Sequence, residues 1–197
     1  MKTPVKFMIT LGIIGVITGF ALALVYKVTL PIIQSQDLKA LQSGLESIFP
    51  GDNDFEKLST PLQSPDQTIK IGDAYVVKQN ETTVGLVITV TTPGSQAPIT
   101  LLIGVRKDGT ISGVRIISMS ETAGLGANAD NPNYFVDKER KITFLGQFVG
   151  KNPNTDPFIA KQDIISITGA TITSTAISNG VKIGGKAAYE YLQGGGL

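Results

Sequence analysis

The sequence predicts an α+β protein in which a single N-terminal transmembrane helix precedes an antiparallel sheet with flanking helices. Three observations lead to this prediction: a charge-free apolar run at residues 7–26, strand-like runs between residues 74 and 119, and apolar residues at helical spacing on either side of those runs. With 197 residues, the chain is long enough for one globular domain and an anchor. We divide it into a tail (1–6), a transmembrane helix (7–30), an amphipathic connecting helix (31–50) and a domain (51–197).

The membrane segment runs without a charge from Phe7 to Tyr26, about the length that crosses a bilayer core as a helix. Lys2 and Lys6 precede it, and positive charge beside a membrane helix favours the cytoplasmic side. We therefore expect a single-pass protein of the cell (inner) membrane, with its tail in the cytoplasm and its domain outside. The alternative is a cleaved signal peptide, because residues 21–23 (Ala-Leu-Ala) resemble a cleavage site. The apolar residues that continue past this site favour the anchor.

The connecting helix is predicted from leucine and isoleucine at helical spacing, and Pro50-Gly51 ends it. Residues 51–68 are polar and rich in Asp, Ser and Pro, so they predict a loop. Asp108-Gly109 suits the positive φ angles of a tight hairpin turn and predicts antiparallel pairing of the strands around it. The predicted strands are residues 74–78, 83–91, 98–106 and 111–119.

The remainder of the chain predicts a mixed region and then a helix. Tyr134, Phe135, Phe144 and Phe148 could stack on a planar ligand, but we favour core packing for most of them. Residues 163–167 form a short β-branched run. The last helix is predicted to begin near residue 174. Its apolar face contains Ile177, Val181, Ala188 and Leu192, and its glycines at 180, 184 and 185 allow close contact with the sheet.

Composition excludes several kinds of chemistry. The chain has no Cys, which excludes disulfides, iron–sulfur clusters and thiolate zinc sites. It has no His, which removes the most common general base and excludes hydrolases that depend on one. The net charge of +1 gives no indication of nucleic-acid binding. Redox chemistry in this chain therefore requires a bound organic cofactor.

Residues 168–174 (Thr-Gly-Ala-Thr-Ile-Thr-Ser) are the most informative segment. Gly169 and Ala170 would let a phosphate approach the backbone, Thr171 offers a hydroxyl, and the start of a helix offers unpaired N–H groups. An ordinary glycine turn with a Thr or Ser N-cap has the same pattern and is more common in proteins. The pattern alone does not choose between an anion site and a capped turn.

The segment resembles the flavinylation motif of the FMN-binding domain family, [ST]-G-A-T, whose last Thr is joined to FMN through the flavin phosphate. The resemblance implies that Thr171 carries covalent FMN. It also implies cofactor-binding roles for Thr168, Gly169, Ala170, Thr173 and Ser174, the last two as helix caps that also bond phosphate oxygens.

One position departs from the family pattern. The family usually has an Asp three residues before the motif, where this chain has Ile165. Asp163 lies two residues earlier and could replace it only if the local backbone is rearranged.

A second segment, residues 121–126, resembles the E-T-P-G-L-G loop of the same family, with Ala123 in place of the proline. Alone, it is also typical of an ordinary glycine-rich turn. The resemblance implies that these residues bind the flavin, with a hydroxyl from Thr122 and an acceptor from Glu121. The implied cofactor-binding residues are Glu121, Thr122, Gly124, Leu125 and Gly126.

Over most of its length the chain resembles the G subunits of Rnf-type ion-translocating electron-transport complexes. This resemblance implies an electron carrier, rather than a complete enzyme, in a complex that couples electron flow between ferredoxin and NAD to Na⁺ or H⁺ translocation. Partners would be the other membrane subunits and a flavin transferase. The chain has no G-x-G-x-x-G fingerprint, so we expect no direct NAD binding. We also expect neither a metal nor a nucleic acid.

Four alternatives remain open. The chain is also compatible with the C-subunit type of Na⁺-translocating NADH:quinone reductase or with an orphan flavinylated carrier. A non-redox, membrane-anchored binding module or a structural assembly protein would be colourless and of unmodified mass. Flavin absorbance that survives denaturation separates the redox interpretations from these last two.

Overall fold

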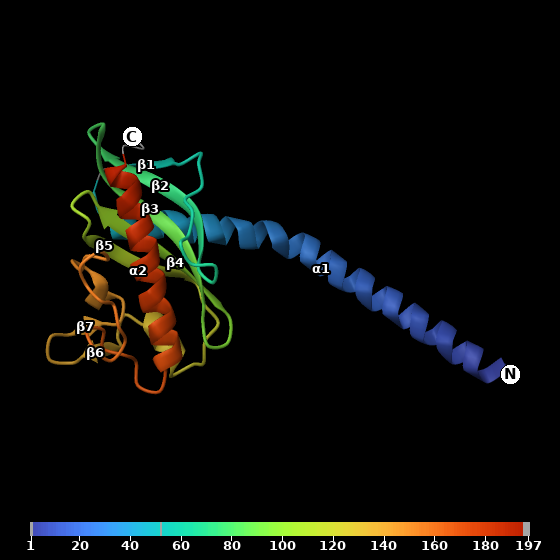
Figure 1. Cartoon of the computed structure of the whole chain (residues 1–197). Coiled ribbons are helices and arrows are strands. Elements are labelled where there is room, and N and C mark those ends of the chain that lie inside the picture. Colours follow the sequence, from blue (N-terminus) through green and yellow to red (C-terminus); the bar gives the residue numbers. More distant parts are fainter. Residues whose placement is uncertain (1, 52, 195–197) are drawn as a thin grey trace. The chain divides into compact units, whose positions relative to one another are not determined.

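The computed structural model describes residues 2–51 and 53–194, and the chain separates into two compact units, residues 1–41 and 42–197 (Figure 1). The first unit belongs to a single helix, α1 (Lys2–Ile48), whose last residues belong to the second unit. The transmembrane and connecting helices predicted from the sequence are therefore one continuous helix. Within α1, Lys6–Leu30 is long and apolar enough to cross a membrane, with a mean hydropathy of 2.4, and none of it is buried against protein.

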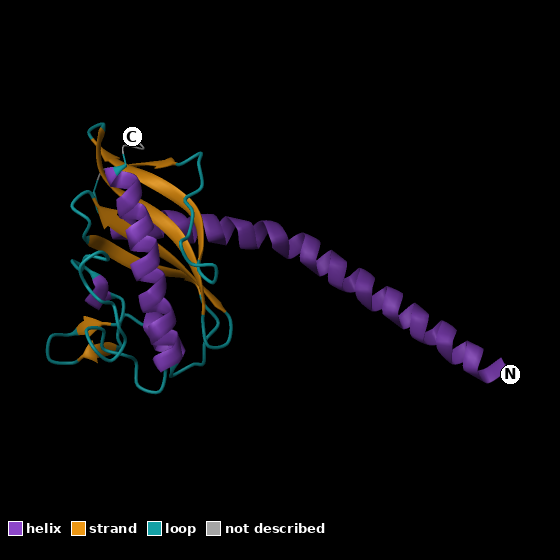
Figure 2. Ribbon diagram, viewed as in Figure 1, coloured by secondary structure: helices purple, strands orange, loops and turns teal. Residues whose placement is uncertain are grey.

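The second unit contains the predicted antiparallel sheet, drawn in orange in Figure 2. Its strand order is the same as the sequence order. The strands predicted from apolar runs are all present, although β2 starts earlier than expected. One strand, β1, lies in the segment that we predicted to be a loop. It is a four-residue edge strand without apolar alternation, so only its pairing with β2 defines it. The strands are β1 (Asp54–Lys57), β2 (Lys70–Gln79), β3 (Thr82–Pro93), β4 (Pro98–Arg106) and β5 (Ile111–Ser118).

The hairpin between β4 and β5 forms as predicted. Gly109 has a φ of +88°, which L-residues rarely adopt. The Asp108 carboxylate accepts hydrogen bonds from the N–H and the hydroxyl of Thr110, at 2.9 and 2.7 Å. The turn chemistry that sets the register of these two strands was therefore readable from the sequence.

Helix residues pack against both faces of the sheet, and glycines allow close approach at each contact. On one face lies α2 (Thr171–Gln193), whose glycines face large sheet residues: a Cβ on Gly184 would lie 2.6 Å from Val90 Cγ2. On the other face, Gly44 of α1 likewise meets Leu102 of β4, but glycines of the sheet also face large residues at the end of α1. A Cβ on Gly104 would collide with Ile48 and lie 2.9 Å from Phe49. Alternation along each strand sends neighbouring side chains to these two different contacts.

The segment between β5 and α2 is compact despite little regular structure. Phe144, Phe148 and Phe158 are fully buried; the first two meet edge to face at 5.6 Å and the last two stack at 6.0 Å. Core packing is therefore the right interpretation for Phe144 and Phe148, while Tyr134 is half-buried against the same core. The short elements here are η1 (Gly126–Asp130), β6 (Phe135–Asp137), β7 (Ile142–Thr143) and η2 (Gly146–Phe148).

Candidate functional site

The two segments singled out in the sequence come together in the structure. The 121–126 loop leaves the end of β5 and leads into η1, and the 168–174 segment leads into α2. They meet through side chains: the Thr173 hydroxyl donates a 2.7 Å hydrogen bond to Glu121 Oε2, across 52 positions of sequence. Two motifs that the family pattern only placed in order along the chain are thus in physical contact.

Glu121 joins a third segment to this contact. Its other carboxylate oxygen accepts hydrogen bonds from the N–H groups of Ser95 (2.8 Å) and Gln96 (3.1 Å), in the turn between β3 and β4. Partial burial acts to raise the pKa of Glu121, but the Thr173 hydroxyl and the N–H groups of Gln96 and Ser95 outweigh it. The pKa therefore lies below its usual value, and Glu121 is an anion at neutral pH.

Glycines allow the two segments to approach so closely. A Cβ on Gly126 would lie 2.7 Å from Thr173 Oγ1 and 2.9 Å from Glu121 Oε2, so any side chain there would disturb that hydrogen bond. Gly169 has a φ of +75°, and a Cβ there would lie 2.9 Å from Leu125 Cδ2. Gly124 also has a positive φ, +76°, with open space around it, so its role is conformational.

Helix α2 begins at Thr171, not near Ser174 as predicted, and no side chain caps it. The expectation that Thr173 and Ser174 cap the helix is therefore wrong. Both are buried; Thr173 bonds Glu121, while Ser174 donates to the Ala170 carbonyl (2.9 Å) and accepts from the Ile167 N–H (3.0 Å). Ser174 fixes the chain where it enters the helix, and its hydroxyl proton is already used.

Unpaired polar groups remain at the first turn. The Ser174 N–H is the first to reach an intrahelical acceptor, the Ala170 carbonyl at 3.0 Å. The N–H groups of residues 171–173 have no acceptor among the described residues, and neither has the half-buried hydroxyl of Thr171. One hydroxyl and three parallel N–H groups at the positive end of a helix dipole suit a phosphate.

Comparison with known proteins connects this geometry to a family. Residues 94–184 match the FMN-binding domain family. The chain is 30% identical to the G subunit of a proton-translocating ferredoxin:NAD⁺ oxidoreductase complex from Clostridium ljungdahlii, over 84% of this chain and 81% of that one. It is 28% identical to the G subunit of the corresponding Na⁺-translocating complex from Acetobacterium woodii, over 92% and 90% of the two chains.

The chain belongs to the G-subunit family of ion-translocating oxidoreductase complexes. A solved structure, the C subunit of the Na⁺-translocating NADH-quinone reductase from Parabacteroides distasonis, is 23% identical over 61% of either chain with a TM-score of 0.40. That likeness is too low to support an argument about function.

Asp163, the nearest acidic residue before the 168–174 segment, has hydrogen-bond partners of its own. Its carboxylate accepts hydrogen bonds from the N–H groups of Phe158 (3.1 Å) and Ile159 (2.6 Å) and from the Lys151 ammonium (3.2 Å). It therefore holds the 158–163 loop. Those hydrogen bonds outweigh the effect of its partial burial, and the pKa of Asp163 lies below its usual value.

Gln147, which sequence reasoning missed, holds Ile165 instead. Its side-chain amide accepts from the Ile165 N–H (2.8 Å) and donates to the Ile165 carbonyl (3.1 Å), as a neighbouring strand would. No local pattern around residue 147 indicates this role, because the two residues are 18 positions apart and lie outside regular strands.

Most of the remaining predicted residues are exposed. Thr122 is exposed, and its hydroxyl accepts a 2.6 Å hydrogen bond from the Gln96 side chain, which leaves its own proton free to donate. Thr168 and Leu125 are exposed, whereas Ala170 is buried. The two predicted segments thus meet beside the first turn of α2 through the Glu121–Thr173 hydrogen bond and the close approach of Leu125 to Gly169.

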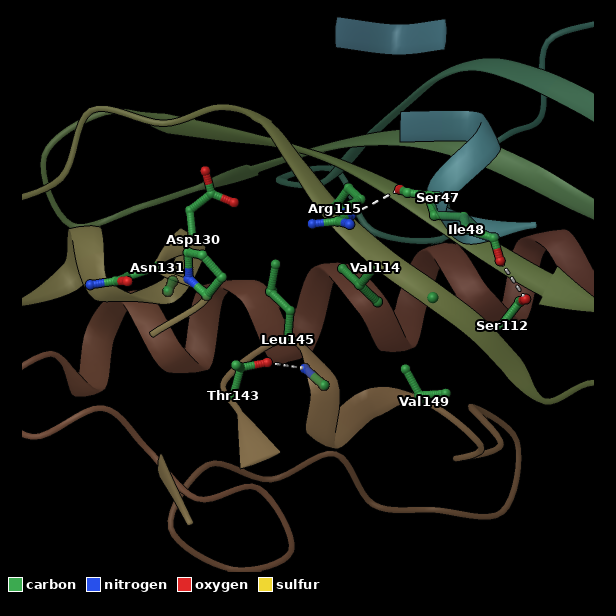
Figure 3. Close-up of a pocket in the computed structure, with 14 residues that line it drawn as sticks. Ser47, Ile48, Ser112, Val114, Arg115, Asp130, Asn131, Thr143, Leu145 and Val149 are labelled. Atoms are coloured by element: carbon green, nitrogen blue, oxygen red, sulfur yellow. Dashed lines mark hydrogen bonds between the residues drawn. The ribbon is translucent and has the colours of Figure 1, made fainter. Parts of the chain in front are cut away.

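A separate cleft of about 450 Å³ lies between the end of α1, β5 and the 129–149 segment (Figure 3). Arg115 Nε donates to Ser47 Oγ at 2.9 Å, and the Ser112 hydroxyl donates to the Ile48 carbonyl at 2.8 Å. These bonds fasten the last turn of α1 to β5. None of the predicted site residues lines this cleft, so we do not assign the cofactor to it. No cluster of three or more acidic residues able to hold a metal occurs in the described part of the chain.

Proposed function

We propose that this protein is a membrane-anchored electron carrier of an Rnf-type ion-translocating ferredoxin:NAD oxidoreductase complex, with FMN joined through its phosphate to Thr171. The observation that carries the proposal is the first turn of α2. A hydroxyl without a partner and three unpaired N–H groups lie together there, next to a loop that the family match includes. The relatives are named as subunits of ferredoxin:NAD⁺ oxidoreductase complexes.

The residues present fit FMN chemically. When bound, FMN supplies the electron-transfer chemistry that no side chain of this chain provides. The N–H groups of residues 171–173 and the helix dipole stabilise the negative phosphate. The small residues Gly169 and Ala170 leave room for the phosphate, and Leu125 has an apolar side chain beside Gly169. Glu121 acts indirectly. Its hydrogen bond with Thr173 holds that residue in place and so fixes the orientation of the start of α2.

The attachment is tested by mass spectrometry of the full chain, purified from cells that contain its flavin transferase. Because the Thr171 oxygen becomes a phosphate ester, the peptide that contains it gains the mass of FMN less one water. Flavin absorbance stays with the denatured protein. Flavin on Thr173 or Ser174 would contradict the assignment, and a colourless chain of unmodified mass would favour a non-redox binding module or a structural assembly protein.

We further propose that Lys6–Leu30 spans the cell membrane, with residues 1–6 in the cytoplasm and residues 51–197 outside. The length and hydropathy of this segment support a membrane span. The lysines that precede it support the orientation. A covalent link keeps the cofactor on a carrier that faces an open compartment. Ferredoxin and NAD would bind other subunits of the complex.

The orientation is tested with a Ser59→Cys variant, since the chain has no other cysteine and Ser59 is exposed. An impermeant thiol reagent should label this variant in intact cells, after removal or permeabilisation of any outer membrane. Labelling only after lysis would place the domain in the cytoplasm and contradict the proposed orientation.

A further inference from the structure

Thr171 borders two clefts, and we propose, on the basis of FMN attachment at Thr171, that the isoalloxazine ring occupies the one formed by residues 161–169. This first cleft has a volume of about 430 Å³. The second, of about 340 Å³, is formed by residues 66–69, the end of β3 and the first turns of α2. Either is within reach of a cofactor tethered to Thr171, so the choice depends on what lines them.

Apolar surface is available in both clefts. Ile165 is 44% exposed in the first cleft, and Ile172 is 64% exposed in the second. A flat ring against either would remove apolar surface from water. Buried apolar residues line both clefts as well, Ile164 and Ile167 in the first and Ile69 and Ala176 in the second. Apolar contact alone therefore does not choose between them.

Hydrogen-bonding capacity separates the two clefts. Ser166 lines the first cleft, and its Oγ is the one buried side-chain polar atom without a partner in the described part of the chain. Such a hydroxyl is costly to leave unpaired, so a ligand in this cleft that gives it a partner is favoured. The pyrimidine edge of a flavin carries carbonyl oxygens, which can accept a hydrogen bond from the Ser166 hydroxyl, and an N–H, which can donate one to it.

The second cleft has no such buried unpaired group among the described residues. The Asp66 carboxylate accepts from the Thr68 N–H (2.7 Å) and hydroxyl (2.6 Å). The Thr92 hydroxyl donates to the Ala176 carbonyl at 3.1 Å, and Thr175 and Asn179 are exposed to water. A ring in this cleft would therefore give no buried polar group a missing partner.

The charged side chains that line the two clefts also favour the first cleft. Lys161 lines the first cleft and forms no ion pair within the described residues, whereas Asp66 lines the second. Reduction places negative charge on the ring, which a nearby ammonium group favours and a carboxylate opposes. The first cleft is therefore the better environment for a flavin that must accept electrons.

The chain contains no tryptophan, which permits a direct test of ring position. Indole quenches flavin fluorescence on contact, so a single engineered Trp reports which cleft holds the ring. In the full flavinylated chain, Ile165→Trp should lower the fluorescence per flavin several-fold, or lower flavin occupancy by filling the cleft. Ile172→Trp, an exposed isoleucine adjacent to the attachment site, is the matched control and should do neither.

A second pair of variants tests the hydrogen bond. Ser166→Ala should shift the flavin absorption bands, while its fold is retained because the hydroxyl has no partner in the protein. Thr175→Ala, an exposed hydroxyl of the second cleft, should leave the bands unchanged.

Stronger quenching from Ile172→Trp, or a band shift only in Thr175→Ala, would overturn the placement while leaving the attachment at Thr171 intact. Absence of flavin from the unsubstituted chain would instead overturn the proposed function, and the placement with it.

Discussion

The first turn of α2 and the turns that follow it belong to one helix but interact with their surroundings in opposite ways. Residues 171–174 present polar groups: an unpaired hydroxyl, three unpaired N–H groups, and two buried hydroxyls bonded to nearby loops. Farther along, Gly180 and Gly184 bring the helix against apolar side chains of β3 and β4. The proposed modification chemistry and the packing of the fold therefore rest on different residues, and single substitutions should separate them.

The largest expected effect tests the polar turn alone. Thr171→Ala should abolish the flavin adduct completely, because it removes the only atom to which we assign the phosphate ester. Stability should change by no more than about 0.5 kcal/mol, since the hydroxyl has no partner among the described residues. Mass spectrometry and thermal unfolding of the same preparation measure both effects, with Thr175→Ala as the control that keeps its flavin. An adduct retained by Thr171→Ala would contradict the assignment.

Gly126→Val should affect both properties, because this residue lies where the two segments meet. The new side chain would displace Thr173 from Glu121 and, with it, the first turn of α2. We expect a large loss of flavin incorporation and a loss of stability of about 1–3 kcal/mol, typical of overpacking. Gly124→Ala at the neighbouring glycine controls for conformational strain alone, since its φ is positive but an added Cβ would have no atom of the described residues within 4 Å. Normal flavin incorporation in Gly126→Val would show that this loop has no part in the site.

Gly184→Ala should affect the packed part of the helix alone. Its Cβ would lie 2.6 Å from Val90 Cγ2, and a β-branched neighbour in a strand has little freedom to move. Overpacking of about 1–3 kcal/mol exceeds the gain of about 1 kcal/mol from replacing a helical glycine, so the variant should be less stable. Gly180→Ala, with its nearest contact at 3.1 Å to the more flexible Leu101, should be near neutral. Denaturant unfolding measures both; equal stabilities would mean that close contact at Gly184 does not limit the packing.

Glu121→Gln should produce a smaller effect that depends on pH. Because the folded pKa of Glu121 lies below its ordinary value of about 4.3, its contribution to stability is present above that value and lost as pH falls through the folded pKa. The variant should be roughly 1 kcal/mol less stable at neutral pH and lose less on acidification. Unfolding at pH 7 and pH 3 tests this. Parallel pH profiles for the two proteins would mean that the ionised carboxylate does not hold the three segments together.

The smallest effect is expected for Ala123→Pro. Ala123 is exposed, and its N–H has no acceptor in the described part of the chain, so proline removes no hydrogen bond. Flavin content and unfolding midpoint should equal those of the parent. A clear loss of flavin would show that the backbone of this loop does not accommodate proline at position 123.

Sequence reasoning succeeded where chemistry is local. The runs of valine, isoleucine and leucine in β3, β4 and β5 define strands because they alternate between two covered faces, and Asp108-Gly109 defines the turn between two of them. Residues 121–126 and 168–174 could be found because their glycines and hydroxyls form patterns within a few positions.

The missed features depend on distant partners. β1 has no apolar alternation and exists through pairing with β2. The local pattern predicts the start of α2 too late, because the hydroxyls of Thr173 and Ser174 look like caps until Glu121 and Ile167 are seen to use them. The role of Gln147 depends on its hydrogen bond with Ile165, 18 positions away. Ser166 is notable because its hydroxyl is buried without a partner among the described residues. No local spacing in the sequence indicates either feature.

The strand order β1-β2-β3-β4-β5 bears on how this protein folds. Every pairing in the sheet joins neighbours in sequence, so the sheet can form from successive hairpins at low entropic cost. The contact of Glu121 with Thr173, 52 positions apart, requires α2 to dock on that sheet. Under the proposed attachment at Thr171, a flavin transferase would meet a properly formed acceptor only after the chain has been synthesised through α2, so flavin loading would report that folding is complete.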